Sequence, residues 1–392
     1  MSRILKLLTV VENRYDAARF RWRQRRGLGV LKIMPFVGYG TPDTLILKGR
    51  VLRDKNISPP MASASLITNL VDTYKRFQSD EIPGATIRAR FGDHAETATT
   101  NDEGFFEFHL KPGVLPPSDD HIYLIDLEVV DYPGKALNPV EPAQFKAQGQ
   151  VIVPPDGAEF GVISDIDDTV LRSNVTDILS LVRNTFLENA HTRLPFEGVA
   201  RLYQALRRGA SGANFNPIFY VSSSTWNLYD VLHDFLIVRE IPLGALFLSE
   251  YNLDEETFIV QNRRKHKIAA IETIMKAYPD LSFVLMGDSG EKDPLIYRDI
   301  ARQYPERIRA IYIRTATLSR RRDARVQAIV REAVALGVPI RLVQDSYAAA
   351  QHAAEIGLIH PDSLPAIREQ RDEDRQAPTP VQQALNLPPS GQ

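Results

Sequence analysis

The chain has 392 residues and not one cysteine. This absence excludes disulfide bonds, thiolate metal sites and cysteine nucleophiles together. It fits a reducing compartment, where disulfides do not persist. With 44% apolar and 24% charged residues, the composition is that of a globular protein, and the length suits two domains with tails.

Long hydrophobic runs are also missing. The longest one near the start is Leu7-Leu8-Thr9-Val10-Val11, which is too short for the core of a signal peptide. No stretch supplies the roughly 20 apolar residues that a membrane-spanning helix needs. We therefore expect a cytoplasmic protein whose contact with a membrane, if it has one, is peripheral.

The net charge of −2 is unevenly distributed along the chain. Residues 1–26 carry a net charge of +6, so the remainder carries −8. Within residues 3–26, apolar residues from Ile4 to Trp22 recur at helical spacing and most arginines lie elsewhere. The pattern predicts an amphipathic helix. It either packs on the protein itself, the simpler interpretation, or lies on an anionic membrane surface.

The first half of the chain predicts β structure. Residues 1–40 are interpreted as the basic helix and a linker, and residues 41–153 as a small all-β sandwich. Met61–Phe77 is interpreted as an insertion and Pro133–Pro155 as a linker. Turn signals rich in Gly, Pro, Asn and Asp separate the expected strands, which are Leu45–Leu52, Ala85–Phe91, Ala95–Thr100, Phe105–Leu110 and Tyr123–Val130.

Residues 157–360 alternate β-rich apolar runs with helical patterns. This predicts an α/β domain with a doubly wound, parallel, Rossmann-like sheet and ligands at the carboxyl ends of its strands. The expected strands are Phe160–Ser164, Pro217–Ser222, Ala245–Ser249, Phe283–Gly287, Ile308–Ile313 and Ile340–Val343. The expected helices include Gly198–Arg208, Thr225–Arg239, Lys267–Ala277, Pro294–Gln303, Arg320–Leu336 and Tyr347–Ile356. Residues 365–392, rich in Gln, Pro and charge, predict a disordered tail.

Polar residues gather at four of these strand or helix ends. They are Asp165 with Asp167, Ser222-Ser223-Ser224, the basic run Arg263–Lys267, and Gly287–Asp293. Alternation along a strand puts Asp165 and Asp167 on one side, where two carboxylates repel unless a cation or a proton lies between them. The basic run precedes the expected helix Ile268–Ala277, and cations at a helix N-terminus oppose its dipole, which points to an anion site.

Each cluster also has an ordinary structural explanation, as a turn, a helix cap or a solvated surface.

Among metals, a hard cation such as Mg²⁺ suits Asp165, Asp167 and Asp288. An EF-hand starting at Asp165 would need Gly at position 170 and Glu at 176, where the chain has Val170 and Thr176. Zinc is disfavoured by the lack of cysteine and of paired histidines. Phosphate-loop and dinucleotide motifs are absent.

These four clusters resemble, in order and context, the four motifs of the haloacid dehalogenase phosphatase superfamily. The motif residues are Asp-Ile-Asp-Asp-Thr at 165–169, Ser222, Lys267 and Gly-Asp-x-x-x-x-Asp at 287–293. The longer stretches Ser164–Ser173, Tyr220–Tyr229 and Gly287–Tyr297 are similar to the actin-patch-associated phosphatidate phosphatase family, to which lipins are more distantly related. The resemblance covers about residues 157–359, and Thr225 departs from it where proline is expected.

The resemblance implies a role for each motif residue. Asp165 is the nucleophile that becomes the aspartyl-phosphate, and Asp167 is the general acid and then the general base. The phosphoryl oxygens are bound by Ser222, with Ser223 beside it or in its place, and by Lys267, with Lys265 as the alternative. The implied Mg²⁺ site comprises Asp165, Asp167, Asp288 and Asp293, the last acting on Asp288 or on a metal-bound water.

The function implied is a Mg²⁺-dependent phosphatase that converts phosphatidate to diacylglycerol at a membrane surface. The gaps from Asp165 to Ser222 and from Ser222 to Lys267, 57 and 45 positions, hold no full cap domain. An open site suits a large or membrane-bound phosphomonoester. The alternatives are a phosphatase of a phosphoprotein, a nucleic-acid end or a soluble metabolite, and a non-catalytic module that binds lipid or protein. We expect no other nucleic-acid partner, and the oligomeric state stays open.

Overall fold

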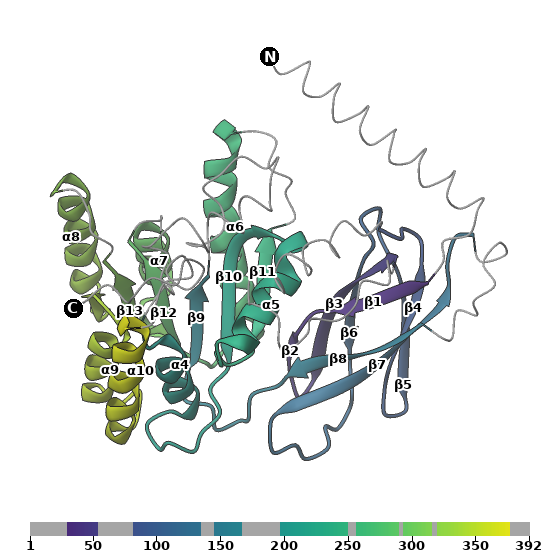
Figure 1. Ribbon diagram of the computed structural model, residues 1–392, viewed down its shortest axis with the longest axis horizontal. Coiled ribbons are helices and arrows are strands. Elements are labelled where there is room, and N and C mark those ends of the chain that lie inside the picture. The colour runs from purple at the N-terminus through teal and green to yellow at the C-terminus, as the bar shows by residue number, and fades with distance from the viewer. Residues whose placement is uncertain are drawn as a thin grey trace. The chain divides into compact units, whose positions relative to one another are not determined.

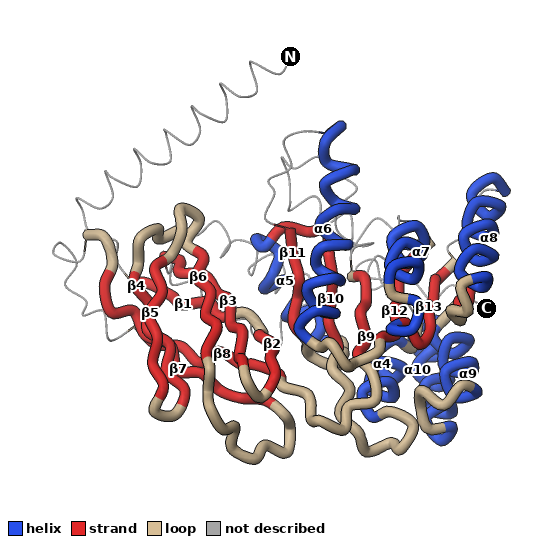
Figure 2. Tube along the Cα trace, turned by 180° about the vertical axis from the view of Figure 1, so that it is seen from behind, coloured by secondary structure: helices blue, strands red, loops and turns tan. Residues whose placement is uncertain are grey.

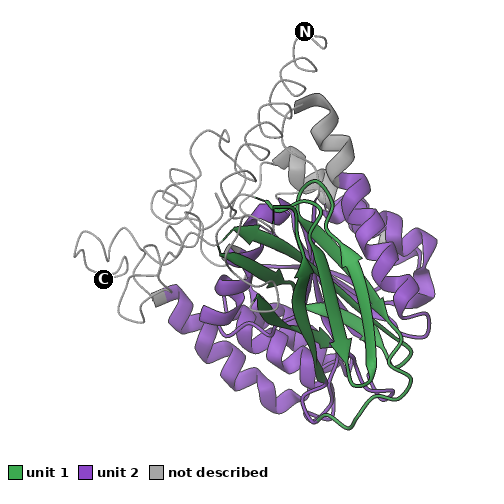
Figure 3. Ribbon diagram, turned by 90° about the vertical axis from the view of Figure 1, so that its right-hand side faces the viewer, with its two compact units in different colours: residues 1–59, 78–118, 122–151 green, residues 60–77, 119–121, 152–392 purple. Residues whose placement is uncertain are grey.

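The computed structural model describes residues 30–53, 81–134, 145–166, 197–249, 256–289, 293–315 and 320–376. The chain divides into two compact units, the first made up mainly of residues before 152 and the second mainly of those after it (Figure 3). The predictions for residues 3–26, for Met61–Phe77 and for Asp167 lie outside the described residues, as do those for residues 377–392 of the predicted tail.

The first unit is built on one eight-stranded sheet with the order β1-β3-β2-β8-β7-β4-β5, in which β6 pairs with β3. Its strands are β1 (Leu31–Pro35), β2 (Gly38–Thr41), β3 (Thr44–Arg53), β4 (Thr86–Phe91), β5 (His94–Thr99), β6 (Phe105–Leu110), β7 (Ile122–Asp131) and β8 (Lys146–Ile152). Alternate residues of β7, among them Ile125, Leu127 and Val129, are buried, which is the pattern of a strand with one face on the core.

Three features of this unit differ from the prediction. Strands β1 and β2 occupy residues assigned to a linker, and β8 lies within the predicted linker Pro133–Pro155. The sequence of β8, Lys-Ala-Gln-Gly-Gln-Val-Ile, shows little apolar alternation and so does not predict a strand. In the structure only Gly149, Val151 and Ile152 of this strand are buried. The strands described for this unit, β1 to β8, all belong to one hydrogen-bonded sheet, so the predicted sandwich of two sheets is not confirmed in this part of the chain.

The second unit is a mixed α/β structure around a six-stranded parallel sheet. Its strands are β9 (Gly161–Asp165), β10 (Ile218–Thr225), β11 (Ala245–Ser249), β12 (Phe283–Asp288), β13 (Ile308–Arg314) and β14 (Ile340–Val343), each within three residues of the predicted bounds. The spatial order is β11-β10-β9-β12-β13-β14. The chain thus builds outward from β9 in one direction and then in the other, which leaves β9 in the middle.

Helices cover both faces of this sheet. One group contains α4 (Val199–Arg208), α9 (Ser346–Glu355) and α10 (Leu364–Gln376), which pack on one another, and the other contains α6 (Glu256–Ala277), α7 (Asp293–Gln303) and α8 (Arg320–Ala335) (Figure 1). Seen from behind, α6 and α7 of the second group lie in front of the strands (Figure 2). Helix α5 (Tyr229–Val238) follows β10. None of the helices in the described ranges is long and apolar enough to cross a membrane.

Two helix predictions were wrong. Helix α6 begins at Glu256, so the basic residues 263–267 lie inside it and not at its N-terminus, and the dipole argument for an anion site fails. Residues 365–376, assigned to a disordered tail, belong to α10. The polar composition of α10 is misleading because Ile367 is fully buried, and because Asp374 and Arg375 bond Gly198 and Asp345, the residues just before α4 and α9.

Candidate active site

Asp165 is the last residue of β9, the strand in the middle of the parallel sheet. The apolar run Val162-Ile163 before it is fully buried between β10 and β12. Because the carboxyl ends of parallel strands meet at one edge, Asp165 lies near Ser222 in the carboxyl-terminal half of β10 and near Asp288 at the end of β12. The structure therefore brings these predicted site residues to one edge, while Asp167 lies outside the described residues.

Lys267 of α6 forms two contacts with these carboxylates. Its Nζ donates to Asp165 Oδ1 at 2.7 Å and to Asp293 Oδ1 at 3.0 Å. All three side chains are nearly inaccessible to solvent, at 4% or less. Burial of such charges is tolerable only when they are paired and hydrogen-bonded, as here. Lys265, the alternative phosphate-binding residue, lies two positions away on α6 and is exposed.

Asp293 connects the lysine to the Asp288 loop. It is the first residue of α7, where the helix dipole favours a carboxylate, and its Oδ2 accepts a hydrogen bond from the Asp288 backbone N–H at 3.1 Å. Gly287 is required by this close approach, since a Cβ there would lie 2.6 Å from Asp293 Oδ2. The spacing of the Gly-Asp-x-x-x-x-Asp motif thus has a steric and a hydrogen-bonding cause.

The serines at the end of β10 are buried. Ser222 is inaccessible to solvent, Ser223 is 8% exposed, and the Ser222 hydroxyl accepts from the Ser224 backbone N–H at 2.9 Å. These residues still belong to β10, and Val221, the residue before Ser222, is the register partner of Asp165. Trp226 follows and stacks on Tyr229, which anchors the turn to α5.

Two residues that sequence reasoning missed support this edge from behind. The Tyr297 hydroxyl of α7 donates to the Met286 carbonyl at 2.7 Å, and Tyr203 of α4 hydrogen-bonds Ser164 at 2.5 Å. Burial is the main cause that raises the pKa of both phenols, with the charge of Asp293 adding to the effect at Tyr297. Both phenols therefore stay neutral. Tyr297 ends the motif stretch Gly287–Tyr297, whereas the position of Tyr203 offered no signal in the sequence.

A third missed residue is Arg314, which ends β13 as Asp165 ends β9. Its Nε lies 3.9 Å from Asp288 Oδ2. Strand register could have predicted this residue, because Arg314 of β13 is the direct partner of Asp288 in the parallel pair β12–β13. The site thus contains two cationic side chains and three described carboxylates.

The chemistry of the donor set fits a hard divalent cation. Asp165 and Asp288 supply carboxylate oxygens from adjacent strands, and Mg²⁺ is bound in proteins through one or two carboxylates with water and phosphate completing its shell. No group of three acidic or histidine side chains with metal-binding geometry occurs within the described ranges, which exclude Asp167. The described residues therefore suit Mg²⁺ better than a metal that needs a full protein cage.

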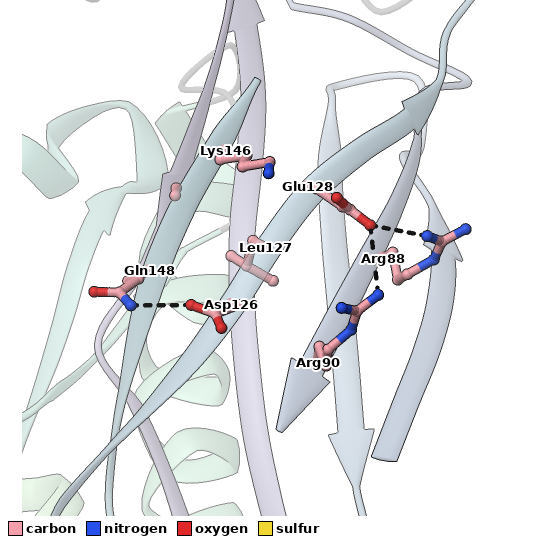
Figure 4. A pocket seen from close by; sticks show the side chains of 8 residues that line it. Arg88, Arg90, Asp126, Leu127, Glu128, Lys146 and Gln148 are labelled. Atoms are coloured by element: carbon pink, nitrogen blue, oxygen red, sulfur yellow. Dashed lines mark hydrogen bonds and ion pairs between the residues drawn. The ribbon is translucent and has the colours of Figure 1, made fainter. Parts of the chain in front are cut away.

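A separate hollow of about 500 Å³ occurs in the first unit. Figure 4 shows its lining on the exposed side of β4, β7 and β8, where Arg88 bonds Glu128 at 2.8 Å and Gln148 bonds Asp126 at 2.9 Å. Its charged side chains largely pair with one another, and none of the motif residues lies there. The candidate active site therefore stays at Asp165, and this hollow is separate from it.

Residues 160–315, which hold the whole described site, match the family model described as phosphatidate phosphatase APP1, catalytic domain. Phosphatidate phosphatase APP1 of Saccharomyces cerevisiae is 37% identical over 161 residues, which cover 41% of this chain and 26% of that protein. An uncharacterized protein of Schizosaccharomyces pombe is 31% identical over 157 residues, covering 40% and 25%. The match spans about a quarter of the length of these curated relatives.

Among solved structures, a carbohydrate acetylesterase from Xanthomonas citri aligns over 88% of this chain and 75% of its own, at 10% identity and a TM-score of 0.30. A likeness of that size supports no conclusion about fold or function. The match to the family model is more specific, because it contains Asp165, Ser222, Lys267, Asp288 and Asp293 within one continuous segment. Residues 160–315 are therefore similar to the catalytic domain of the APP1 phosphatidate phosphatase family.

Proposed function

We propose that this protein is a Mg²⁺-dependent phosphomonoesterase that hydrolyses phosphatidate to diacylglycerol at a membrane surface. The observation that carries the proposal is the buried Asp165 carboxylate, held by Lys267 at the carboxyl edge of the sheet inside the segment that matches the family. A carboxylate with a fixed lysine beside it is equipped for nucleophilic attack on a phosphoryl group.

In the proposed reaction, an Asp165 oxygen forms a bond to phosphorus while the bond from phosphorus to the leaving oxygen breaks. Asp167 gives its proton to that oxygen, which leaves as the hydroxyl of diacylglycerol. Asp167 then takes a proton from water as the water attacks the aspartyl-phosphate and releases inorganic phosphate. At the end of the reaction Asp165 is again a free carboxylate and Asp167 again carries a proton, so one water molecule has been consumed for each phosphate released.

Lys267 and the serines would bind the transferred group. Lys267 already lies 2.7 Å from Asp165, so a phosphoryl group bonded to that carboxylate comes within reach of the ammonium. Ser222 and Ser223 offer hydroxyl and backbone donors on the β10 side. When bound at Asp165 and Asp288, Mg²⁺ would supply further neutralisation of the phosphoryl oxygens. Asp293 would hold both Lys267 and the Asp288 loop in position through its hydrogen bonds to the Lys267 ammonium and the Asp288 N–H.

We also propose that the second unit has a haloacid dehalogenase-type fold. Support comes from the strand order β11-β10-β9-β12-β13-β14 and from the nucleophile position at the end of the central strand β9. The proposal of phosphatidate as substrate rests on the relative named for that activity. Contact with an anionic membrane is assigned to the basic residues 1–26.

The test is phosphate release from vesicles containing phosphatidate, with Mg²⁺ or with chelator. Wild-type protein should release phosphate only with Mg²⁺, and Asp165→Asn should lose at least about 10³-fold in rate. Asp156→Asn, an exposed aspartate in the turn before β9, is the matched control and should keep full activity. Equal rates for wild type and Asp165→Asn would exclude the mechanism.

The substrate needs a second comparison. Soluble phosphomonoesters, a phosphopeptide and a phosphorylated DNA end should be hydrolysed far more slowly than phosphatidate in vesicles. Replacing Arg19, Arg21, Arg23 and Arg25 by Gln in the full chain should weaken co-sedimentation with anionic vesicles, since each basic residue near a membrane contributes about 1 kcal/mol. If the protein hydrolyses a soluble ester faster than phosphatidate, and if vesicles do not change its rate, the soluble ester is the substrate and phosphatidate is not.

A further inference from the structure

Arg314 brings a second positive charge to the candidate active site. It is the last residue of β13, and the parallel register places it directly beside Asp288. The two strand ends are tied together, since the Ser289 backbone N–H donates to the Arg314 carbonyl at 2.8 Å. The guanidinium Nε then lies 3.9 Å from Asp288 Oδ2, so the position of the cation relative to the carboxylate is set by the sheet.

The contact differs in kind from that of Lys267. Lys267 forms hydrogen bonds of 2.7 and 3.0 Å with its two carboxylates and is 4% exposed. The Arg314 contact of 3.9 Å is too long for a hydrogen bond between those two atoms, and its side chain is 22% exposed. Between Arg314 Nε and Asp288 Oδ2 the attraction is therefore one of charge at close range.

The charges of the described site divide into two sets. Lys267 is shared by Asp165 and Asp293, while Arg314 is the cation nearest to Asp288 in the ion pairs of the described residues. Asp288 is buried, with its side chain 5% exposed, so screening by water is reduced there. A divalent cation that binds Asp288 therefore meets a positive charge that is already in place.

We propose that Arg314 is a positioning residue that competes with the divalent cation for Asp288 and thereby weakens cation binding. The inference rests on the proposed function only in that a divalent cation binds at Asp288. Without the cation, Arg314 balances the Asp288 charge and keeps the carboxylate beside β13. With the cation, the repulsion between two positive charges limits affinity, which keeps the site dependent on the free Mg²⁺ concentration.

Isothermal titration of the full-length protein with MgCl₂ and with MnCl₂ tests this directly, without substrate. Arg314→Gln should bind the cation about tenfold more tightly than wild type, the effect expected for removal of one nearby charge. Arg314→Lys keeps the charge and should stay within about twofold of wild type. Arg309→Gln removes an exposed arginine five positions earlier on the same strand and should leave affinity unchanged.

The Mg²⁺ concentration for half-maximal phosphate release should fall in Arg314→Gln by the same factor. Unchanged or weaker cation binding in Arg314→Gln would overturn the inference, because competition predicts a gain. Equal tightening in Arg309→Gln would overturn it too, since the effect would then be one of net charge. If wild type releases phosphate yet binds no cation, the inference falls while the phosphatase activity stands. If it binds cation as described but releases no phosphate, the proposed function falls alone.

Discussion

Lys267 Nζ lies 2.7 Å from Asp165 Oδ1, and the two residues are 102 positions apart in the chain. A second bond of 3.0 Å joins the same ammonium to Asp293, so one lysine balances two buried carboxylates. The pairing is formed between the middle strand of the sheet and a covering helix. It makes the stability of the second unit depend on the same residues that are proposed to carry out the chemistry.

Lys267→Met should therefore damage both stability and activity. Removing one partner of a buried ion pair costs about 3–5 kcal/mol, because the remaining charges are left without compensation. We expect a lower free energy of unfolding in urea and loss of phosphate release. Lys265→Met, two positions away and exposed, should change unfolding by less than about 0.5 kcal/mol and keep activity. If Lys265→Met proves the more damaging variant, the two lysines have been assigned in the wrong order.

Gly287→Ala tests the steric reason for the Gly-Asp motif. The added Cβ would lie 2.6 Å from Asp293 Oδ2 and 2.8 Å from Asp293 Cβ and Tyr297 Cε2, so Asp293 must move. Overpacking of this kind costs about 1–3 kcal/mol. The displacement also disturbs Lys267, and phosphate release should fall at least about tenfold, the loss that a small misplacement of reacting groups produces.

The matched control is Gly157→Ala. No atom lies within 4 Å of the Cβ it would carry, so its unfolding midpoint should stay at or slightly above the wild-type value. Thermal unfolding followed by circular dichroism measures both variants. A wild-type melting curve and activity for Gly287→Ala would show that the Asp293 contact is not needed.

The described site was largely predictable because its residues follow strongly apolar strands. Val162-Ile163 before Asp165 and Val284-Leu285-Met286 before Asp288 are buried on both faces, and such runs are visible in a sequence. Parallel strands then bring their carboxyl ends together, so adjacency followed from the fold class. The fold class did not decide whether Lys265 or Lys267 faces the site. Which of the two side chains is buried depends on how α6 is rotated against β10.

The remaining errors come from partners that are distant in the chain. Arg314 belongs to the site only because its register on the parallel sheet places it beside Asp288. Residues 146–152 form strand β8 because β2 and β7, its neighbours in the sheet, supply backbone hydrogen-bond partners. The composition of α10 resembles that of a disordered tail until its contacts are known. Asp374 accepts from the Gly198 N–H at 2.7 Å, and Arg375 bonds Asp345 at 2.7 Å, which are 176 and 30 positions away.

Helix α10 should therefore contribute measurably to stability. Ile367 is fully buried, and Ile367→Ala should cost about 2–4 kcal/mol of unfolding free energy. Asp374→Ala removes the acceptor for the N–H of Gly198, the residue before α4, and should cost about 1 kcal/mol, as loss of a hydrogen bond does. The exposed Arg368→Ala on the same helix is the control, with a change below about 0.5 kcal/mol. Three wild-type unfolding curves would mean that α10 does not pack on the domain in solution.

His352 predicts how the stability of the second unit depends on pH. It lies on α9 with its Nδ1 3.0 Å from the Tyr312 hydroxyl, and its ring packs edge-on against that of Tyr312. Burial, helped by the nearby charge of Arg341, lowers its pKa from the ordinary value of 6.5. Burial likewise raises the pKa of Tyr312, which stays a neutral partner.

The sign of the effect follows from which state binds the proton more readily. The unfolded chain takes up a proton on His352 near pH 6.5, whereas the folded protein does so only at lower pH, so protonation favours unfolding. The contribution of His352 is complete above pH 6.5 and is lost as the pH falls from there towards its folded pKa. Urea unfolding at pH 7.5, 6.5 and 5.5 should show this decline in wild type. His352→Gln can still hydrogen-bond Tyr312 but does not titrate, and its decline should be smaller. An equal decline in both proteins would assign the pH dependence to other groups.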